Sequence, residues 1–131
     1  MAEDSLGKLH ISSWYSNGSI FALRLTDNIS GSFVGQNIES DPGLPKGISS
    51  SLAIDSQDKR HILYLDRDGN TVKYATDKYG SWDISIIGEY PGDEEENFIT
   101  AITIDSNDKI HGAYYGSTTL GGPCEGLCYV H

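Results

Sequence analysis

The segment IDSQDKRHILYLD, from Ile54 to Asp66, decides the fold because the chain repeats it. A second version, IDSNDKIHGAYYG, covers Ile104–Gly116, and a third, EDSLGKLHISSWY, covers Glu3–Tyr15. The copies are offset by 51 and 50 residues. A fixed period along the chain indicates that one supersecondary unit is repeated. Four residue types recur at the same places: Asp4, Asp55 and Asp105; Ser5, Ser56 and Ser106; Lys8, Lys59 and Lys109; and His10, His61 and His111.

The composition indicates that the repeated unit is made of β-strands. The chain has 15 glycines and 8 tyrosines in 131 residues, which suit turns and half-buried strand faces. No long segment has the 3.6-residue period of a helix. A β-rich period of about 40 to 50 residues is typical of β-propeller blades, each a sheet of four antiparallel strands. We therefore predict an all-β protein built of propeller-type blades.

The middle copy predicts a complete blade. Its expected strands are 50–56, 60–66, 71–76 and 82–90, and short turns separate them. The turn RDGN, at 67–70, is a hairpin signal of the Asp-Gly type. The segment PGDEEEN that follows the fourth strand is expected to lead into the next blade.

The flanking copies predict incomplete blades. The first copy lacks most of a first strand and the last copy ends before a fourth, which gives about two and a half blades, at 1–46, 47–96 and 97–131. Propellers close a ring with about four to eight blades, so strand edges are left open. Open edges pair with other chains. We therefore expect either a homo-oligomer formed through the open blade edges or a segment cut from a longer protein.

The charge limits the partners. The chain has 9 Lys and Arg against 19 Asp and Glu, a formal net charge of -10. Such a surface repels nucleic acid and anionic lipid, so we expect neither nucleic acid nor a membrane as a partner. The sequence has no apolar run of transmembrane length and no signal-peptide pattern at Met1. The compartment stays open, although excision from a longer secreted protein would favour the cell surface or exterior.

The repeated histidine has two interpretations. One imidazole per blade can line a ligand site or bind a metal. Alternatively, each histidine hydrogen-bonds the aspartate six residues earlier and pins its own blade. A reaction needs its catalytic group once, whereas every blade needs its structural group, so we predict the structural role and no catalytic residue. The residues concerned are Asp4, His10, Asp55, His61, Asp105 and His111.

Acidic residues in the turns resemble fragments of calcium loops. Asp105 and Asn107 alternate as calcium ligands do, but Lys109 stands at the next ligand place. Asp66 and Asp68 are followed directly by a strand. Tight β-turns account for all of these residues, so we predict no metal and no cofactor.

Five aromatic residues fall late in the expected second strands. One face of each strand must pack against a neighbouring blade, which is one role for these rings. Aromatic planes at the end of a blade also stack on sugars, so the same residues are the candidate ligand-binding residues and a glycan is the candidate ligand. They are Trp14, Tyr15, Tyr64, Tyr114 and Tyr115.

The chain has two cysteines, Cys124 and Cys128, with three residues between them. Two free thiols, a local disulfide and a Cys/Cys/His cluster completed by His131 are the alternatives. The spacing alone does not choose among them.

A family resemblance is carried by the pattern SLAIDS-x-D-K-x-H-I-x-Y-x-D, followed by G-x-x-VKYAT and GSW. The pattern resembles tandem-repeat β-propeller proteins related to the Asp-box (BNR) sialidase-like superfamily. The box, S-x-D-x-G-x-T-W, is a structural turn between the third and fourth strands in that family. Here Asp77 and Trp82 keep its spacing while Gly80 comes one place late, and the first copy has Asp27 and Phe33. The resemblance implies a propeller fold and a structural role for Asp77 and Trp82.

The resemblance carries no catalysis to this chain. Sialidases of that superfamily bind substrate with three arginines and use a tyrosine–glutamate nucleophile pair. The arginines here, Arg24, Arg60 and Arg67, fall in different strand or turn contexts. We predict a non-enzymatic binding or scaffold module, with carbohydrate as the leading ligand. The alternatives are a fragment of a sialidase-like glycoside hydrolase and a purely structural self-assembling protein.

Overall fold

A computed structural model gives the fold, and it describes residues 1–90, 99–116 and 126–131. The described residues form β-strands and no helix, so the predicted all-β class is confirmed. The first sheet contains β1 (Ala2–Glu3), β2 (Leu9–Ser16), β3 (Phe21–Asp27) and β4 (Val34–Asp41). The second contains β5 (Lys46–Ile54), β6 (Arg60–Asp66), β7 (Thr71–Thr76) and β8 (Asp83–Glu89). The third contains β9 (Thr100–Ile104), β10 (Ile110–Gly116) and β11 (Gly126–Val130).

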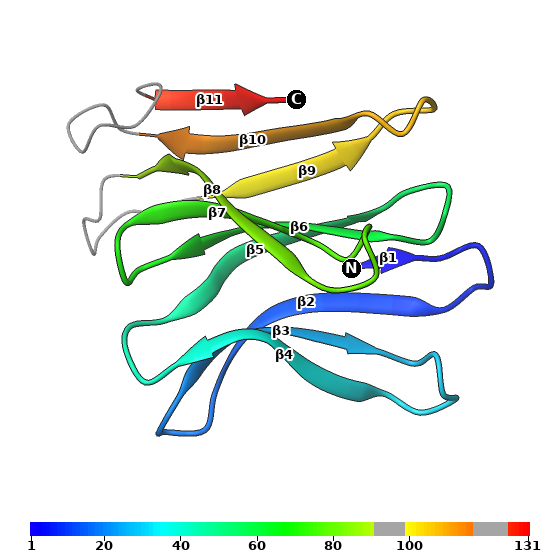
Figure 1. The fold of residues 1–131 in the computed structure, drawn as a ribbon, viewed down its shortest axis with the longest axis horizontal. Coiled ribbons are helices and arrows are strands. Elements are labelled where there is room, and N and C mark those ends of the chain that lie inside the picture. The colour runs from blue at the N-terminus through cyan, green and yellow to red at the C-terminus, as the bar shows by residue number, and fades with distance from the viewer. Residues whose placement is uncertain (91–98, 117–125) are drawn as a thin grey trace.

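Each sheet is an antiparallel meander, because every strand pairs with the strand that follows it in the sequence. The three sheets lie side by side in chain order, from β1–β4 at the bottom of Figure 1 to β9–β11 at the top. The first strand of the second sheet, β5, contacts β2 of the first sheet and β9 of the third. The four strands expected in the middle copy correspond to β5–β8, and β5 begins earlier than expected, at Lys46.

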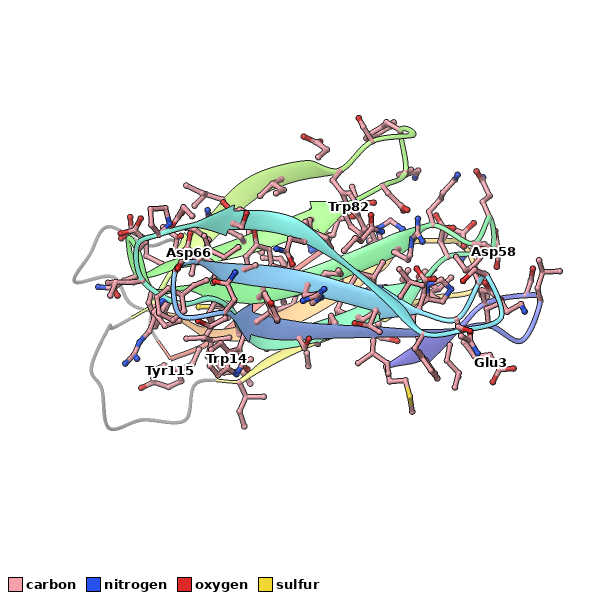
Figure 2. All side chains as sticks on the ribbon, turned by 90° about the horizontal axis from the view of Figure 1, so that it is seen from below. Glu3, Trp14, Asp58, Asp66, Trp82 and Tyr115 are labelled. Atoms are coloured by element: carbon pink, nitrogen blue, oxygen red, sulfur yellow. The ribbon has the colours of Figure 1, made fainter. Side chains whose placement is uncertain are left out.

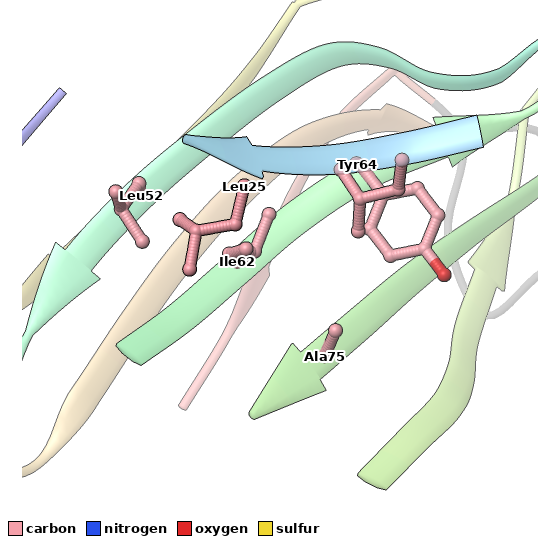
Figure 3. Packing of buried hydrophobic residues seen from close by; sticks show 6 residues of the cluster. Leu25, Leu52, Ile62, Tyr64 and Ala75 are labelled. Carbon is pink, nitrogen blue, oxygen red and sulfur yellow. The ribbon is translucent and has the colours of Figure 1, made fainter. Parts of the chain in front are cut away.

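The middle sheet is buried on both faces. Consecutive residues of a strand point to opposite faces, so Ile62 and Tyr64 of β6 face the first sheet, while Leu63 and Leu65 face the third. Figure 3 shows the first of the two layers. The layer between the first and second sheets contains Leu23, Leu25, Leu52, Ile62, Tyr64 and Ala75. The layer between the second and third contains Leu63, Leu65, Val72, Tyr90, Tyr114 and Cys128.

Glycines allow the sheets to approach one another closely at two positions. A Cβ at Gly47, where φ is +78°, would lie 2.8 Å from the Cα of Leu23 in the first sheet. A Cβ at Gly88 would overlap the ring of Tyr114, which reaches across from the third sheet. Glycine is therefore required where backbone or ring of one sheet presses on the backbone of the next.

Candidate functional site: the repeated turns and the open third sheet

Each copy of the repeated motif forms a tight turn between two strands of its sheet. In the middle copy, Oδ1 of Asp55 accepts hydrogen bonds from the backbone N–H groups of Gln57 and Lys59, both at 2.9 Å. Asp58, within this turn, has a left-handed backbone with φ of 59°. The turn recurs in the other sheets, where the equivalents of Asp55 and Asp58 are Asp4 and Gly7 in the first and Asp105 and Asp108 in the third.

The second oxygen of each repeated aspartate contacts the repeated histidine. The distance from His Nε2 to Asp Oδ2 is 3.0 Å in the first copy, 3.2 Å in the second and 3.1 Å in the third. The hydrogen bond expected from the six-residue spacing is thus present in every copy. The histidine hydrogen bond lowers the pKa of Asp4 and Asp105. Burial raises the pKa of Asp55, but hydrogen bonds from the Lys59 backbone and from His61 outweigh it, and the pKa is lowered.

The other ring nitrogen of the histidine differs among the copies. Nδ1 of His61 lies 2.5 Å from the hydroxyl of Tyr74, and Nδ1 of His111 contacts the equivalent hydroxyl of Tyr129. Nδ1 of the buried His10 has no hydrogen-bond partner in the described part of the chain. In the second and third sheets, a hydrogen-bonded Asp–His–Tyr chain therefore joins the turn to two neighbouring strands.

A serine beside the repeated aspartate links each sheet to the next. The N–H and hydroxyl of Ser5 donate to the two carboxylate oxygens of Asp58, at 2.7 and 2.6 Å. The N–H and hydroxyl of Ser56 donate in the same way to Asp108, at 2.9 and 2.5 Å. We call these contacts the Ser–Asp inter-sheet pairs. In Figure 2, Asp58 and Asp66 are at opposite ends of the molecule, so the first pair joins the two sheets at the end away from Asp66.

The third sheet has the serine of such a pair without an aspartate for it. Ser106 is exposed and has no hydrogen-bond partner within residues 1–90, 99–116 and 126–131. Both aspartates of the series are bound already, by Ser5 and Ser56. The first sheet has Gly7 at the place of the aspartate. Sequence reasoning aligned the serines but missed the pairs, because the aspartates recur in only two of the three copies.

The Asp-box-like turn lies between β7 and β8. Asp77 accepts hydrogen bonds from the backbone N–H and the guanidinium of Arg60, and this guanidinium lies 5.8 Å from the ring centroid of Trp82. In the first sheet, Asn28 accepts the equivalent backbone hydrogen bond from the start of β2, at 2.8 Å. Sequence comparison matched Asp27 to Asp77, and this alignment is one residue out.

A second polar cluster lies between the first two sheets, and Lys46 and Asp66 are its buried members. Nζ of Lys46 lies 2.8 Å from Asp41 and 2.8 Å from Asp66, and Nζ of Lys73 lies 2.6 Å from Glu39 and 2.6 Å from Asp66. Burial raises the pKa of Asp66, but the hydrogen bonds from the two lysines outweigh it, and the pKa is lowered. The sequence predicted only a turn at Asp66, because these contacts depend on how β5 and β7 pair with β6 and on how β4 packs against them.

Tyr64 and Glu39 form a tyrosine–glutamate pair in this cluster, with 2.6 Å between the hydroxyl and Oε2. The Tyr64 side chain is fully buried, and burial raises the pKa of its phenol. A nucleophile needs access to substrate and an activated hydroxyl, which this geometry denies. Arg24 and Arg60 belong to different sheets and do not converge on the pair. Glu39 therefore provides the hydrogen-bond acceptor that the buried hydroxyl of Tyr64 needs.

The five aromatic candidates differ in burial. Tyr64 and Tyr114 are 0% and 1% exposed, so they pack between sheets and offer no ring face to a ligand. For these two residues the burial favours packing, the other role that the sequence allowed. Tyr15 is half-buried, with an arginine 4.1 Å above its ring centroid. Trp14 and Tyr115 are 55% and 43% exposed and lie at the same end of the molecule in Figure 2.

The outer face of the third sheet is apolar and exposed. Strand register sets Ala113 beside Tyr129 and Tyr115 beside Leu127 on this face. Leu127 and Tyr129 are 83% and 60% exposed. The third sheet covers the corresponding face of the middle sheet, where the equivalent positions include the buried Leu63, Leu65 and Val72.

The edge formed by β11 differs from the edges formed by β4 and β8. Both β4 and β8 carry two acidic residues, and each has one extra residue against its partner strand, a bulge at Ile38 and at Ile87. β11 has no charged residue and keeps a continuous register with β10. Charges and bulges are the features that keep edge strands from pairing with other chains. β11 therefore has the character of an inner strand.

A small apolar cleft of about 220 Å³ lies beside β11, between the second and third sheets. Its lining includes Ile87 of β8 and Val130 of β11. Between the first and second sheets, Ile38 of β4 and, from the second sheet, Trp82 and Ile84 all pack against the same core. The cleft thus lies where a fourth strand of the third sheet would pack against Ile87.

The cysteine and metal alternatives concern the C-terminal segment. Cys128 is disulfide-bonded, and the described residues contain no free cysteine, while Cys124 lies outside them. His131 stacks on Tyr129, with 5.4 Å between ring centroids. No group of three His, Cys, Asp or Glu side chains in the described ranges has a metal-binding arrangement. The disulfide is therefore the alternative that fits Cys128.

Comparisons with protein-family models, curated proteins and solved structures give no match to this chain. In the part of the chain that the structure describes, no helix is long and apolar enough to cross a membrane.

Proposed function

We propose that the chain is a non-enzymatic binding or scaffold module of the β-propeller type, in which each sheet is one blade, and that it self-associates through β11. Two features support the blade arrangement. The sheets are antiparallel meanders that follow chain order, and all three repeat the same turn and the same Asp–His hydrogen bond.

The observation that carries the proposal is the unprotected edge of β11. Its outward backbone N–H and C=O groups have no paired strand in the described residues, and neither a charge nor a bulge blocks them. A second strand at this edge would also cover the apolar cleft beside Ile87 and Val130. Two effects favour pairing at this edge. The backbone hydrogen bonds of β11 are satisfied, and apolar surface in the cleft is removed from water.

The simplest occupant of this edge is β11 of a second copy. An antiparallel β11–β11 pair has two-fold symmetry, uses the same surface on both chains and closes as a dimer. The strand contributes five residues, Gly126–Val130, enough for a short antiparallel ladder.

The repeated polar groups support a structural rather than a catalytic role. His10 and His61 are buried, and their partners lie within the same sheet. The phenol of Tyr64 is buried against Glu39. Buried hydrogen-bonded networks of this kind rigidify a fold.

Light scattering tests the self-association. The wild-type chain is expected at twice its monomer mass, and Leu127→Lys, which adds a charge to β11, is expected to shift it toward the monomer mass. Leu127 is exposed, so the variant keeps its fold. Ile86→Lys, at an exposed position of β8, is the matched control and is expected to stay dimeric. A monomeric wild type, or equal effects of the two variants, would reject the β11 interface.

Carbohydrate binding is a second candidate function, favoured by the exposed rings of Trp14 and Tyr115 at one end of the molecule. Binding on a glycan array should be lost in Trp14→Ala or Tyr115→Ala, whereas Tyr79→Ala, at another exposed ring, should retain it. Failure of the wild type on the array counts against this function. Hydrolysis of a fluorogenic sialoside by the wild type would instead favour the sialidase-like alternative.

A further inference from the structure

We propose that the outer face of the third sheet binds another sheet of the same repeat, one that carries an aspartate at the left-handed position of its repeated turn, and that Ser106 binds this aspartate. The inference rests on the proposed blade character of the sheets, but not on the pairing of β11. It assigns both an interaction surface and the chemistry of its partner.

The third sheet continues the series of serines that forms the two interfaces inside the chain. At each of them, one serine gives its N–H and hydroxyl to the carboxylate of an aspartate in the next sheet. Ser106 is the third serine of this series, in the same turn geometry fixed by Asp105. Its two donors are the ones that a carboxylate accepts in the preceding sheets, and a charged acceptor makes such hydrogen bonds strong.

The face of the middle sheet that is equivalent to this outer face is buried. On the middle sheet, the positions that correspond to Ala113, Tyr115 and Leu127 are covered by the third sheet. The His–Tyr pair shows the same difference: His61 is buried, whereas the side chain of His111 is 28% exposed. The outer face of the third sheet therefore repeats an interface pattern without the sheet that covers it.

The first sheet has most, but not all, of the features that such a partner needs. The first sheet of a second copy presents Ile11, Thr26 and Arg24 on the face away from its own core. The matching positions of the middle sheet, which face the first sheet, carry an isoleucine, an alanine and a lysine. The first sheet thus resembles a partner in side-chain character, but Gly7 provides no carboxylate for Ser106.

A single substitution can supply this carboxylate. Gly7 has φ of +74°, close to the values of +59° and +58° that Asp58 and Asp108 adopt. A Cβ at position 7 would meet only Glu3, at 3.5 Å, which is an ordinary contact. Gly7→Asp is therefore compatible with the turn, and it turns the first sheet into the partner that the third sheet requires.

The experiment uses full-length chains with one functional surface each. The double variant Gly7→Asp, Ser106→Ala has the aspartate and lacks the serine hydroxyl. It is passed over immobilised wild-type chain and over immobilised Ser106→Ala, and binding is measured over a concentration series. Gly7→Asn, Ser106→Ala is the matched analyte, because asparagine tolerates the left-handed backbone but carries no charge. Thermal melting of each variant verifies its fold.

We expect the aspartate analyte to bind wild type at least about tenfold more tightly than it binds Ser106→Ala, and more tightly than the asparagine analyte binds wild type. Immobilised Ser106→Thr, which keeps a hydroxyl, should restore binding. Equal affinity for wild type and Ser106→Ala, or no binding to either, would overturn the inference. Both analytes also carry Leu127→Lys, which removes β11 pairing and leaves their first sheet unchanged, so the outcome does not depend on whether β11 pairs in light scattering.

Discussion

The hydroxyl of Ser56 lies 2.5 Å from Oδ2 of Asp108, and the N–H of the same serine lies 2.9 Å from Oδ1, although the two residues are 52 positions apart. The contact joins the turns of the second and third sheets, and Ser5 with Asp58 joins those of the first and second. Sheet stacking in this protein thus combines apolar packing in the layers with a carboxylate held by two donors at one end.

The Ser–Asp inter-sheet pair should contribute measurably to stability. Ser56→Ala and Asp108→Asn should each lower the free energy of unfolding by about 1 kcal/mol, because the hydrogen bonds are charge-assisted but exposed. Urea denaturation of both single variants and the double variant gives the coupling energy. Strictly additive losses would show that the two residues do not interact.

The three histidines should differ in what their loss costs. His61→Ala leaves two polar groups, on Asp55 and Tyr74, unpaired in a buried site, so we expect a loss of about 3 kcal/mol. His10 has one partner and should cost about 2 kcal/mol, while the partly exposed His111 should cost about 1 kcal/mol. The urea midpoints of the three alanine variants should follow the same order, with the lowest midpoint for His61→Ala. Equal losses would contradict the hydrogen-bond networks as described.

Acid should destabilise the protein below about pH 4. The pKa of Asp4, Asp41, Asp55, Asp66 and Asp105 is lowered in the folded state. Such groups bind protons more tightly in the unfolded chain, so their contribution is present above the ordinary pKa of about 4 and is lost as the pH falls through the lowered values. Urea unfolding at a series of pH values measures this loss of stability in acid.

Asp66 provides the most specific test of this loss of stability in acid. Burial alone would raise its pKa, but the contacts with two lysines outweigh burial and lower the pKa. The stability difference between wild type and Asp66→Asn should shrink as the pH falls below about 4. Asp83→Asn, at an exposed carboxylate of β8, tests whether the loss of any one negative charge has the same effect. A constant difference for Asp66→Asn would argue against the ion pairs with Lys46 and Lys73.

Gly47 should be the most sensitive of the left-handed glycines. In Gly47→Ala the new Cβ would press on the Cα of Leu23, which cannot move without shifting β3, and we expect a loss of about 3 kcal/mol. Gly18→Ala is the control, because its φ is +88° and no atom lies within 4 Å of the added Cβ. Its cost is the backbone conformation alone, about 1 kcal/mol. Thermal or urea unfolding of the two variants separates the cost of the steric clash at position 47 from the cost of the left-handed backbone alone.

The sequence was sufficient for features that depend on local spacing. The repeat located the turns, the strands of the middle sheet and the Asp–His contacts, because a hydrogen bond across six residues needs only one turn. The antiparallel meander followed from the short turns between strands.

Features that depend on distant partners were not predictable in the same way. The ion pairs of Lys46 with Asp41 and of Lys73 with Glu39 join strands of different sheets, and the Ser–Asp inter-sheet pairs span 53 and 52 residues. The burial of Tyr64 and Tyr114 depends on which faces the neighbouring sheets cover, and a strand buried on both faces loses the alternation that marks an exposed side. The unprotected edge of β11 became visible only beside the acidic, bulged β4 and β8.

Hydrogen exchange along β11 tests the central claim most directly. If two copies pair at this edge, the amides of Gly126–Val130 should become more protected as the protein concentration rises, while those of β4 and β8 stay unchanged. Leu127→Lys should remove the concentration dependence. Rapid, concentration-independent exchange of the outward β11 amides in the wild type would contradict association through this edge.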